Sequence, residues 1–99
     1  MSKKVIWSPA AQKDLEKVLD YLNSKWSERI INKFINKVDD NIGLIIEDPI
    51  IFPLINEELK IRKSVITKHN TLYYRETSEE IQIIRLFDSR QDPNKLTFI

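Results

Sequence analysis

The second half of this chain alternates between apolar and polar residues, and this pattern constrains the fold more than any other feature. Three runs that are rich in β-branched and aromatic residues alternate in this way, namely Leu59–Ile66, Thr71–Thr77 and Ile81–Phe87. The connections between them, residues 67–70 and 78–80, suffice for hairpins and are too short for crossovers. The sequence therefore predicts a three-stranded antiparallel meander in this half.

The first half has a helical period instead. Val5–Trp7 reads as a short strand, and it is followed by Ser8 and Pro9, which are favoured at the cap and at the first position of a helix. Apolar residues then recur at helical spacing in two stretches, residues 9–24 and 27–48. The second stretch ends before a proline, because proline pushes the preceding residue out of the helical region. Two antiparallel helices joined by a short loop are predicted.

Together these elements predict one α+β domain over residues 1–99. We expect an N-terminal strand, and an antiparallel helical hairpin packed on one face of a mainly antiparallel sheet that the C-terminal meander completes. The other face of the sheet stays open. If Leu72 and Tyr74 point toward the helices, alternation sends their neighbours to the open face, where two residues of the preceding strand could join them. This predicted open-face set is Thr71, Tyr73 and Arg75, joined by Lys60 and Arg62.

Two irregular segments have alternative interpretations. The proline-flanked loop of residues 49–53 contains Ile50, Ile51 and Phe52, and its burial under the sheet is favoured over an exposed contact with a partner. Residues 93–99 form either one helical turn or an edge strand.

Composition places the chain in an ordinary class. Hydrophobic residues make up 41% and charged residues 31% of the 99 residues, which is typical of a globular domain and not of a disordered chain. No window approaches the roughly 18 apolar residues of a spanning helix, and no signal peptide is visible. The absence of cysteine excludes disulfides and suits a reducing compartment. We therefore expect a cytoplasmic protein without a membrane partner.

Several kinds of chemistry lack their residues here. One histidine and no cysteine argue against a zinc site, so no metal is expected. Gly43 is the single glycine and stands inside a helical pattern, so no phosphate-binding loop and no small-molecule cofactor are expected. Ser89, Asp88 and His69 could be drawn as a catalytic triad, but no nucleophile elbow surrounds the serine.

A cationic segment remains as the candidate site. The net charge is only +1, yet five basic residues and no acidic one lie between Leu59 and Arg75. Cations interleaved with aromatic rings suit a polyanion with stackable bases, although an acidic protein would use the same surface. Alternatively, Arg75 and Arg85 pair with nearby carboxylates and the surface only keeps the sheet soluble. The candidate carboxylates are Glu76, Glu79, Glu80 or one from the helices. The candidate target-binding or nucleic-acid-binding residues are Lys60, Arg62, Lys68, Tyr73, Arg75, Arg85 and Arg90, with His69 in the same turn as Lys68.

The order of these motifs carries a resemblance over nearly the whole chain. Ser8-Pro9-Ala10-Ala11 with Asp14-Leu15 opens the first helix, and the sequences KHNTLYYR (68–75) and IRLFDSRQDP (84–93) follow in the meander. In this order and spacing they resemble the RelE/ParE superfamily of bacterial type II toxin–antitoxin toxins. The resemblance implies a small toxin with a role in plasmid stabilization and growth inhibition. It also implies that a cognate antitoxin wraps the toxin surface and keeps it inactive.

One branch of the superfamily consists of enzymes. RelE-type members are metal-independent, ribosome-dependent endoribonucleases, or mRNA interferases, and by resemblance Arg62 and Arg90 match two of their basic positions. Three further positions of the nuclease pattern carry Ser64, Thr71 and Leu96, which lack the expected charge or phenol. Histidine titrates near neutrality, so His69 could replace the missing acid or base. If the protein is a ribonuclease, its catalytic residues are therefore Arg62, His69 and Arg90.

The other branch binds and does not cleave. ParE-type members resemble the same scaffold without the nuclease residues, and they act on DNA gyrase. The Tyr73-Tyr74-Arg75 run and the Ile84-Arg85-Leu86 run agree with this branch. We therefore expect a ParE-like toxin that binds gyrase, with a RelE-like ribonuclease acting on mRNA at the ribosome as the alternative. A toxin fold that has lost its toxicity is the third possibility.

Overall fold

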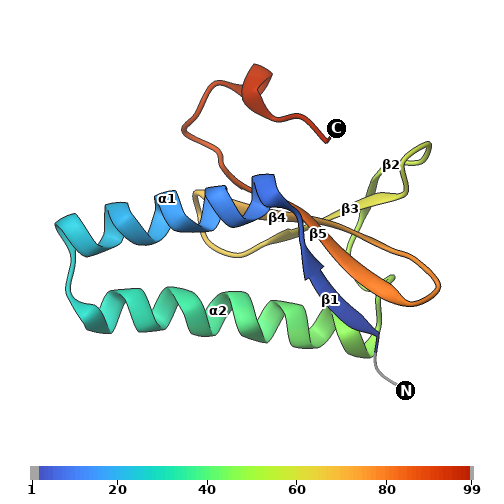
Figure 1. Ribbon diagram of the computed structural model, residues 1–99, viewed down its shortest axis with the longest axis horizontal. Helices are drawn as coiled ribbons and strands as arrows, with labels where there is room; N and C mark the ends of the chain where they lie inside the picture. Colours follow the sequence, from blue (N-terminus) through green and yellow to red (C-terminus); the bar gives the residue numbers. More distant parts are fainter. Residues whose placement is uncertain (1–2, 99) are drawn as a thin grey trace.

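The computed structural model describes residues 3–98, so Met1, Ser2 and Ile99 lie outside the described residues. Two helices pack on one side of a five-stranded sheet, and the C-terminal segment passes over its other side (Figure 1). The elements in chain order are β1 (Lys4–Trp7), α1 (Pro9–Lys25), α2 (Glu28–Glu47), β2 (Leu54–Asn56), β3 (Ile61–Val65), β4 (Asn70–Glu76), β5 (Glu80–Asp88) and the 3-10 turn η1 (Pro93–Lys95).

The sheet has the strand order β1-β5-β4-β3-β2. β1 pairs with β5 in parallel, and every other pair of neighbours is antiparallel. The predicted α+β fold with a helical hairpin and a C-terminal meander is thereby confirmed. The short edge strand β2 was not predicted, because three residues directly after Pro53 are too few to show an alternating pattern. None of the described helices is long and apolar enough to cross a membrane.

The core lies between the helices and the sheet. Leu72 and Tyr74 of β4 are fully buried there, as their predicted orientation requires, and they pack with residues of both helices and of β5. The Tyr74 hydroxyl donates a hydrogen bond of 2.7 Å to the carbonyl oxygen of Pro49, and the Phe52 ring meets the Tyr74 ring edge-on at 6.4 Å. Burial raises the pKa of Tyr74. These contacts fix the end of the loop that follows α2.

The loop itself is only partly buried. Phe52 packs against the core, but Ile50 and Ile51 are 65% and 47% exposed. The expected burial therefore holds for the phenylalanine and is wrong for the two isoleucines. In the C-terminal segment, Pro93–Lys95 forms one helical turn and not an edge strand, while the predicted end of this segment at Ile99 lies outside the described residues.

The predicted placement of Arg62 on the open face is wrong. Arg62 pairs with Tyr74 across the β3–β4 ladder, and partners in a ladder share a face, so Arg62 lies on the helix side. Its Nη1 donates a hydrogen bond of 2.8 Å to the carbonyl oxygen of Phe52. Lys60 lies before β3, at a left-handed φ of 59°. The apolar residues of this run do not alternate strictly, and only the register with β4 decides which side each residue takes.

Candidate functional site

A groove runs between the helical hairpin and the end of the sheet, and we call it the helix–sheet groove. Its volume is about 660 Å³. It is formed by the facing sides of α1 and α2, the β3–β4 turn and the end of β5. Its apolar lining consists of Val18, Tyr21, Leu22, Trp26, Ile30, Phe34 and Leu86.

Large apolar side chains at this groove remain open to solvent. Tyr21 is 45%, Trp26 57% and Ile30 36% exposed. A run of exposed aromatic and aliphatic side chains beside a groove is typical of a surface that binds another protein. From the sequence, the helices are assigned no chemistry, because amphipathic stripes usually belong to a core, and the helical hairpin is expected only to be part of the surface on which an acidic antitoxin docks.

The groove also has a surplus of positive charge. Lys17, Lys33 and Lys37 line it, and none of them forms an ion pair within residues 3–98. The two carboxylates in the groove, Asp14 and Asp88, are each paired with an arginine. The free charge that an incoming partner meets is therefore that of the three lysines.

Arg90 lies at one side of this groove in a small cluster. Its Nη2 donates to Asp88 Oδ2 at 2.8 Å, and its guanidinium carbon lies 5.5 Å from the centre of the Tyr21 ring. The hydrogen bonds from Arg90 lower the pKa of Asp88. His69, in the turn before β4, lines the same groove, and its carbonyl oxygen accepts a hydrogen bond from the Ser89 amide.

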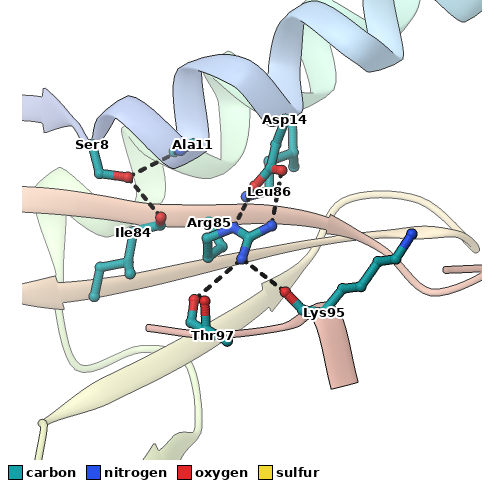
Figure 2. A network of polar contacts seen from close by, with 8 residues as sticks. All are labelled: Ser8, Ala11, Asp14, Ile84, Arg85, Leu86, Lys95 and Thr97. Carbon is teal, nitrogen blue, oxygen red and sulfur yellow. Dashed lines mark hydrogen bonds and ion pairs between the residues drawn. The ribbon is translucent and has the colours of Figure 1, made fainter. Parts of the chain in front are cut away.

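α1 covers the edge of β5 where β1 ends. The last ladder pair is Trp7 with Ile83, and beyond it the side chains of the cap residue Ser8 and of Asp14 in α1 bond to the backbone of β5. Ser8 Oγ donates to the carbonyl oxygen of Ile84 at 2.7 Å, and the amide of Leu86 donates to Asp14 Oδ2 at 3.0 Å (Figure 2). Two backbone groups of this edge are thus satisfied by side chains.

Arg85 connects this edge to the C-terminal segment. Its Nε and Nη2 donate to Asp14 at 2.7 and 3.0 Å, and its Nη1 donates to the carbonyl oxygens of Lys95 and Thr97 at 3.2 Å each (Figure 2). The Asp14–Arg85 pair is nearly buried, with exposed side-chain fractions of 10% and 12%. The hydrogen bond with Asp14 raises the pKa of Arg85.

A β-bulge determines the side on which Arg85 lies. Tyr73 pairs with Arg85 but Tyr74 pairs with Ile83, so Ile84 is the extra residue. Strict alternation from the buried Ile81 and Ile83 would turn Arg85 toward the helices. The bulge reverses the alternation and brings Arg85 beside Tyr73 on the sheet face opposite the helices.

The predicted site residues fall in three places. Tyr73, Arg75 and Arg85 lie on the sheet face opposite the helices, and Arg75 Nε donates to Gln82 Oε1 at 2.7 Å. His69 and Arg90 line the helix–sheet groove, with Lys68 exposed in the same turn as His69. Lys60 and Arg62 lie at the N-terminal end of β3, away from the β3–β4 turn.

The structure does not bring the conditional nuclease residues together. Arg62 lies opposite Tyr74, whereas His69 and Arg90 lie at the end of β4 that begins with Asn70. Four residues of extended strand separate these positions, or about 13 Å. Within residues 3–98, no three His, Asp or Glu side chains gather in a way that could hold a metal ion.

Comparison with protein-family profiles identifies one family. The profile of the family described as "ParE toxin of type II toxin-antitoxin system, parDE" matches residues 5–93. No curated protein sequence matches the chain.

Solved structures share the fold at low sequence identity. A chromosomal ParDE toxin–antitoxin system from P. aeruginosa superimposes with a TM-score of 0.71 at 16% identity, over 88% of this chain and 96% of that chain. A YoeB/ParE toxin from Agrobacterium tumefaciens gives 0.64 at 14% identity, over 86% and 96% of the two chains. The RelBE2 toxin–antitoxin complex from Mycobacterium tuberculosis gives 0.59 at 18% identity, over 89% and 99%. Because the profile spans most of the sequence, this chain belongs to the ParE toxin family of type II toxin–antitoxin systems.

Proposed function

We propose that this protein inhibits bacterial growth by binding DNA gyrase, and that a cognate antitoxin neutralises it. The observation that carries the proposal is the ParE family match over residues 5–93. The separation of Arg62 from His69 and Arg90 also supports a binding toxin over a ribonuclease. General acid, general base and charge-stabilising groups must surround one phosphate to cleave RNA.

The antitoxin occupies the helix–sheet groove in this proposal. Its docking segment is an amphipathic helix, because exposed apolar side chains line a groove of suitable size between two helices. The segment is acidic, because Lys17, Lys33 and Lys37 line the groove and form no ion pair with any residue that the structure describes. The structural relatives in the ParDE and RelBE2 systems are themselves toxin–antitoxin assemblies by description, which supports the presence of such a partner.

A charge reversal tests the groove. The double variant Lys33→Glu/Lys37→Glu should bind the product of the adjacent reading frame at least tenfold more weakly, measured by calorimetry. The matched control is Lys13→Glu/Lys25→Glu, which reverses two exposed lysines that do not line the groove and should bind as the parent does. Equal weakening by both double variants would mean that only overall charge matters and would refute the groove.

The target is tested by inducing the protein alone in a bacterial host and following two signals in one culture. Loss of DNA supercoiling with intact messages would support gyrase as the target. Codon-associated cleavage of messenger RNA with normal supercoiling would refute gyrase as the target. Arg62, His69 and Arg90 would then again be the candidate catalytic residues. No effect on growth would leave a toxin fold without toxicity.

A single substitution tests whether the target binds the sheet face opposite the helices. Arg75→Ala should relieve growth inhibition, because Arg75 lies half-exposed beside Tyr73 on the face opposite the helices. Lys13→Ala, on the exposed side of α1, should remain as toxic as the parent. If Arg75→Ala is folded and fully toxic, the target does not use this face.

A further inference from the structure

The C-terminal residues Asp92–Phe98, which we call the strap, lie across the sheet face opposite the helices. The ring of Phe98 contacts the ring of Tyr73, with centroids 5.3 Å apart and planes inclined at 57°. Arg85 donates two hydrogen bonds to the strap, to the carbonyl oxygens of Lys95 and Thr97 (Figure 2). The strap thus covers part of the face that carries Tyr73 and Arg75.

The strap is attached by side chains of the sheet and not by backbone pairing. Its own backbone hydrogen bonds are local, from the Lys95 amide to Asp92 and from the Leu96 amide to Pro93. Within the described residues, no backbone group of the strap pairs with a strand. Segments held by few contacts open at a small fraction of the free energy of global unfolding. The strap can therefore leave the face while the sheet stays folded.

The surface beneath the strap is prepared in advance. Asp14 clamps two nitrogens of Arg85, so the guanidinium keeps its position whether or not the strap is present. Tyr73 is half-buried on this face, and this burial raises the pKa of its phenol. A rigid donor beside a half-buried aromatic ring is a preorganised binding surface.

The strap itself indicates what this surface accepts. Leu96 and Phe98 are half-buried and Thr97 between them is exposed, as in an extended peptide that turns alternate residues to a sheet. We propose that this face is a peptide-binding surface that the strap occupies in the free toxin. An extended segment of the target protein displaces the strap, placing an aromatic side chain on Tyr73 and carbonyl oxygens on Arg85. This inference rests on the proposed function, because it needs a protein target.

Two matched variants test the competition. Phe98→Ala removes the ring that rests on Tyr73, whereas Thr97→Ala removes an exposed side chain and keeps the carbonyl oxygen that Arg85 holds. Because weakening the strap raises the fraction of open toxin, Phe98→Ala should bind purified gyrase about fivefold more tightly, and Thr97→Ala should bind as the parent does. Unchanged or weaker binding by Phe98→Ala would overturn the proposal.

A second measurement does not depend on the target. In hydrogen exchange of the free toxin, the amides of Lys95, Leu96 and Phe98 should exchange far faster than those of β4 and β5. Equal protection would show that the strap is part of the cooperative fold and would overturn the inference. The inference would also be overturned if binding of the antitoxin, and not binding of gyrase, displaced the strap from the sheet face. If no variant binds gyrase, the proposed function fails, and the exchange data alone decide whether the strap opens.

Discussion

Arg85 shows how much an arginine in a cationic sequence can differ from a free surface charge. It makes four hydrogen bonds, two to Asp14 and two to carbonyl oxygens of the C-terminal segment. Its charge is neutralised and its position is fixed. Arg85 therefore links α1, β5 and the strap. Its contribution to target binding stays a prediction, and the group expected to make that contact is Nη1.

Removal of Asp14 should be costly. Asp14→Ala leaves a nearly buried guanidinium without its counter-ion and leaves the Leu86 amide without its acceptor. The free energy of unfolding should fall by roughly 3 kcal/mol, measured by urea denaturation. Asp20→Ala, an exposed aspartate on the same helix, should change it by less than about 0.5 kcal/mol. Similar values for the two variants would show that the pair contributes little.

The Asp88–Arg90 pair should leave a mark on the pH dependence of stability. Because Arg90 lowers the pKa of Asp88 in the folded protein, the pair stabilises the fold above the ordinary carboxyl value of about 3.9. This contribution is lost as the pH falls below that value and through the lowered pKa. An NMR titration should show the pKa of Asp88 rising in Arg90→Ala, and an identical titration in both proteins would contradict the pairing.

At the scale of elements, α1 is both a helix and the cover of a strand edge. Its cap residue, Ser8, accepts a hydrogen bond from the Ala11 amide and donates one to Ile84. A single hydroxyl therefore begins the helix and joins it to β5.

Two serine caps allow a direct comparison. Ser8→Ala should lower the free energy of unfolding by about 1 to 2 kcal/mol, because both hydrogen bonds are lost. Ser27→Ala should cost only a few tenths of a kcal/mol, because Ser27 caps α2 without a side-chain hydrogen bond. Thermal or urea unfolding of both variants checks this. A larger loss of unfolding free energy for Ser27→Ala than for Ser8→Ala would contradict the stronger role given to the Ser8 cap.

The sequence predicted those features that depend on neighbours along the chain. Both helices, the Ser8 cap of α1 and the three meander strands follow from local periodicity and from prolines at known offsets. The side taken by Arg62 and the bulge at Ile84 did not follow, because strand register is decided between strands. The groove was also missed, because the residues that line it are far apart in the sequence, as Lys17 and Gln91 are.

At the scale of the whole molecule, a net charge of +1 conceals an uneven distribution. Three lysines without ion pairs within residues 3–98 lie around the helix–sheet groove, while the groove's carboxylates are neutralised by arginines. An acidic partner therefore approaches a positive surface on a molecule that is almost neutral overall.

This distribution should appear in the kinetics of association. The rate constant for binding of the antitoxin should fall about tenfold or more when salt is raised from roughly 50 to roughly 500 mM, because salt screens exposed charges. Lys33→Glu/Lys37→Glu should flatten this dependence, measured by stopped-flow tryptophan fluorescence, because Trp26 lines the groove. A rate that does not respond to salt would exclude electrostatic steering.

The parallel pairing of β1 with β5 also has a consequence for synthesis. Ser8 binds Ile84 across a separation of 76 residues, so the first strand has no neighbour until the last strand has been made. A chain emerging from the ribosome can form its helices early, but it can close the sheet only when translation has passed Asp88. The folded sheet, and every surface that depends on it, therefore cannot form before β5 has been synthesised.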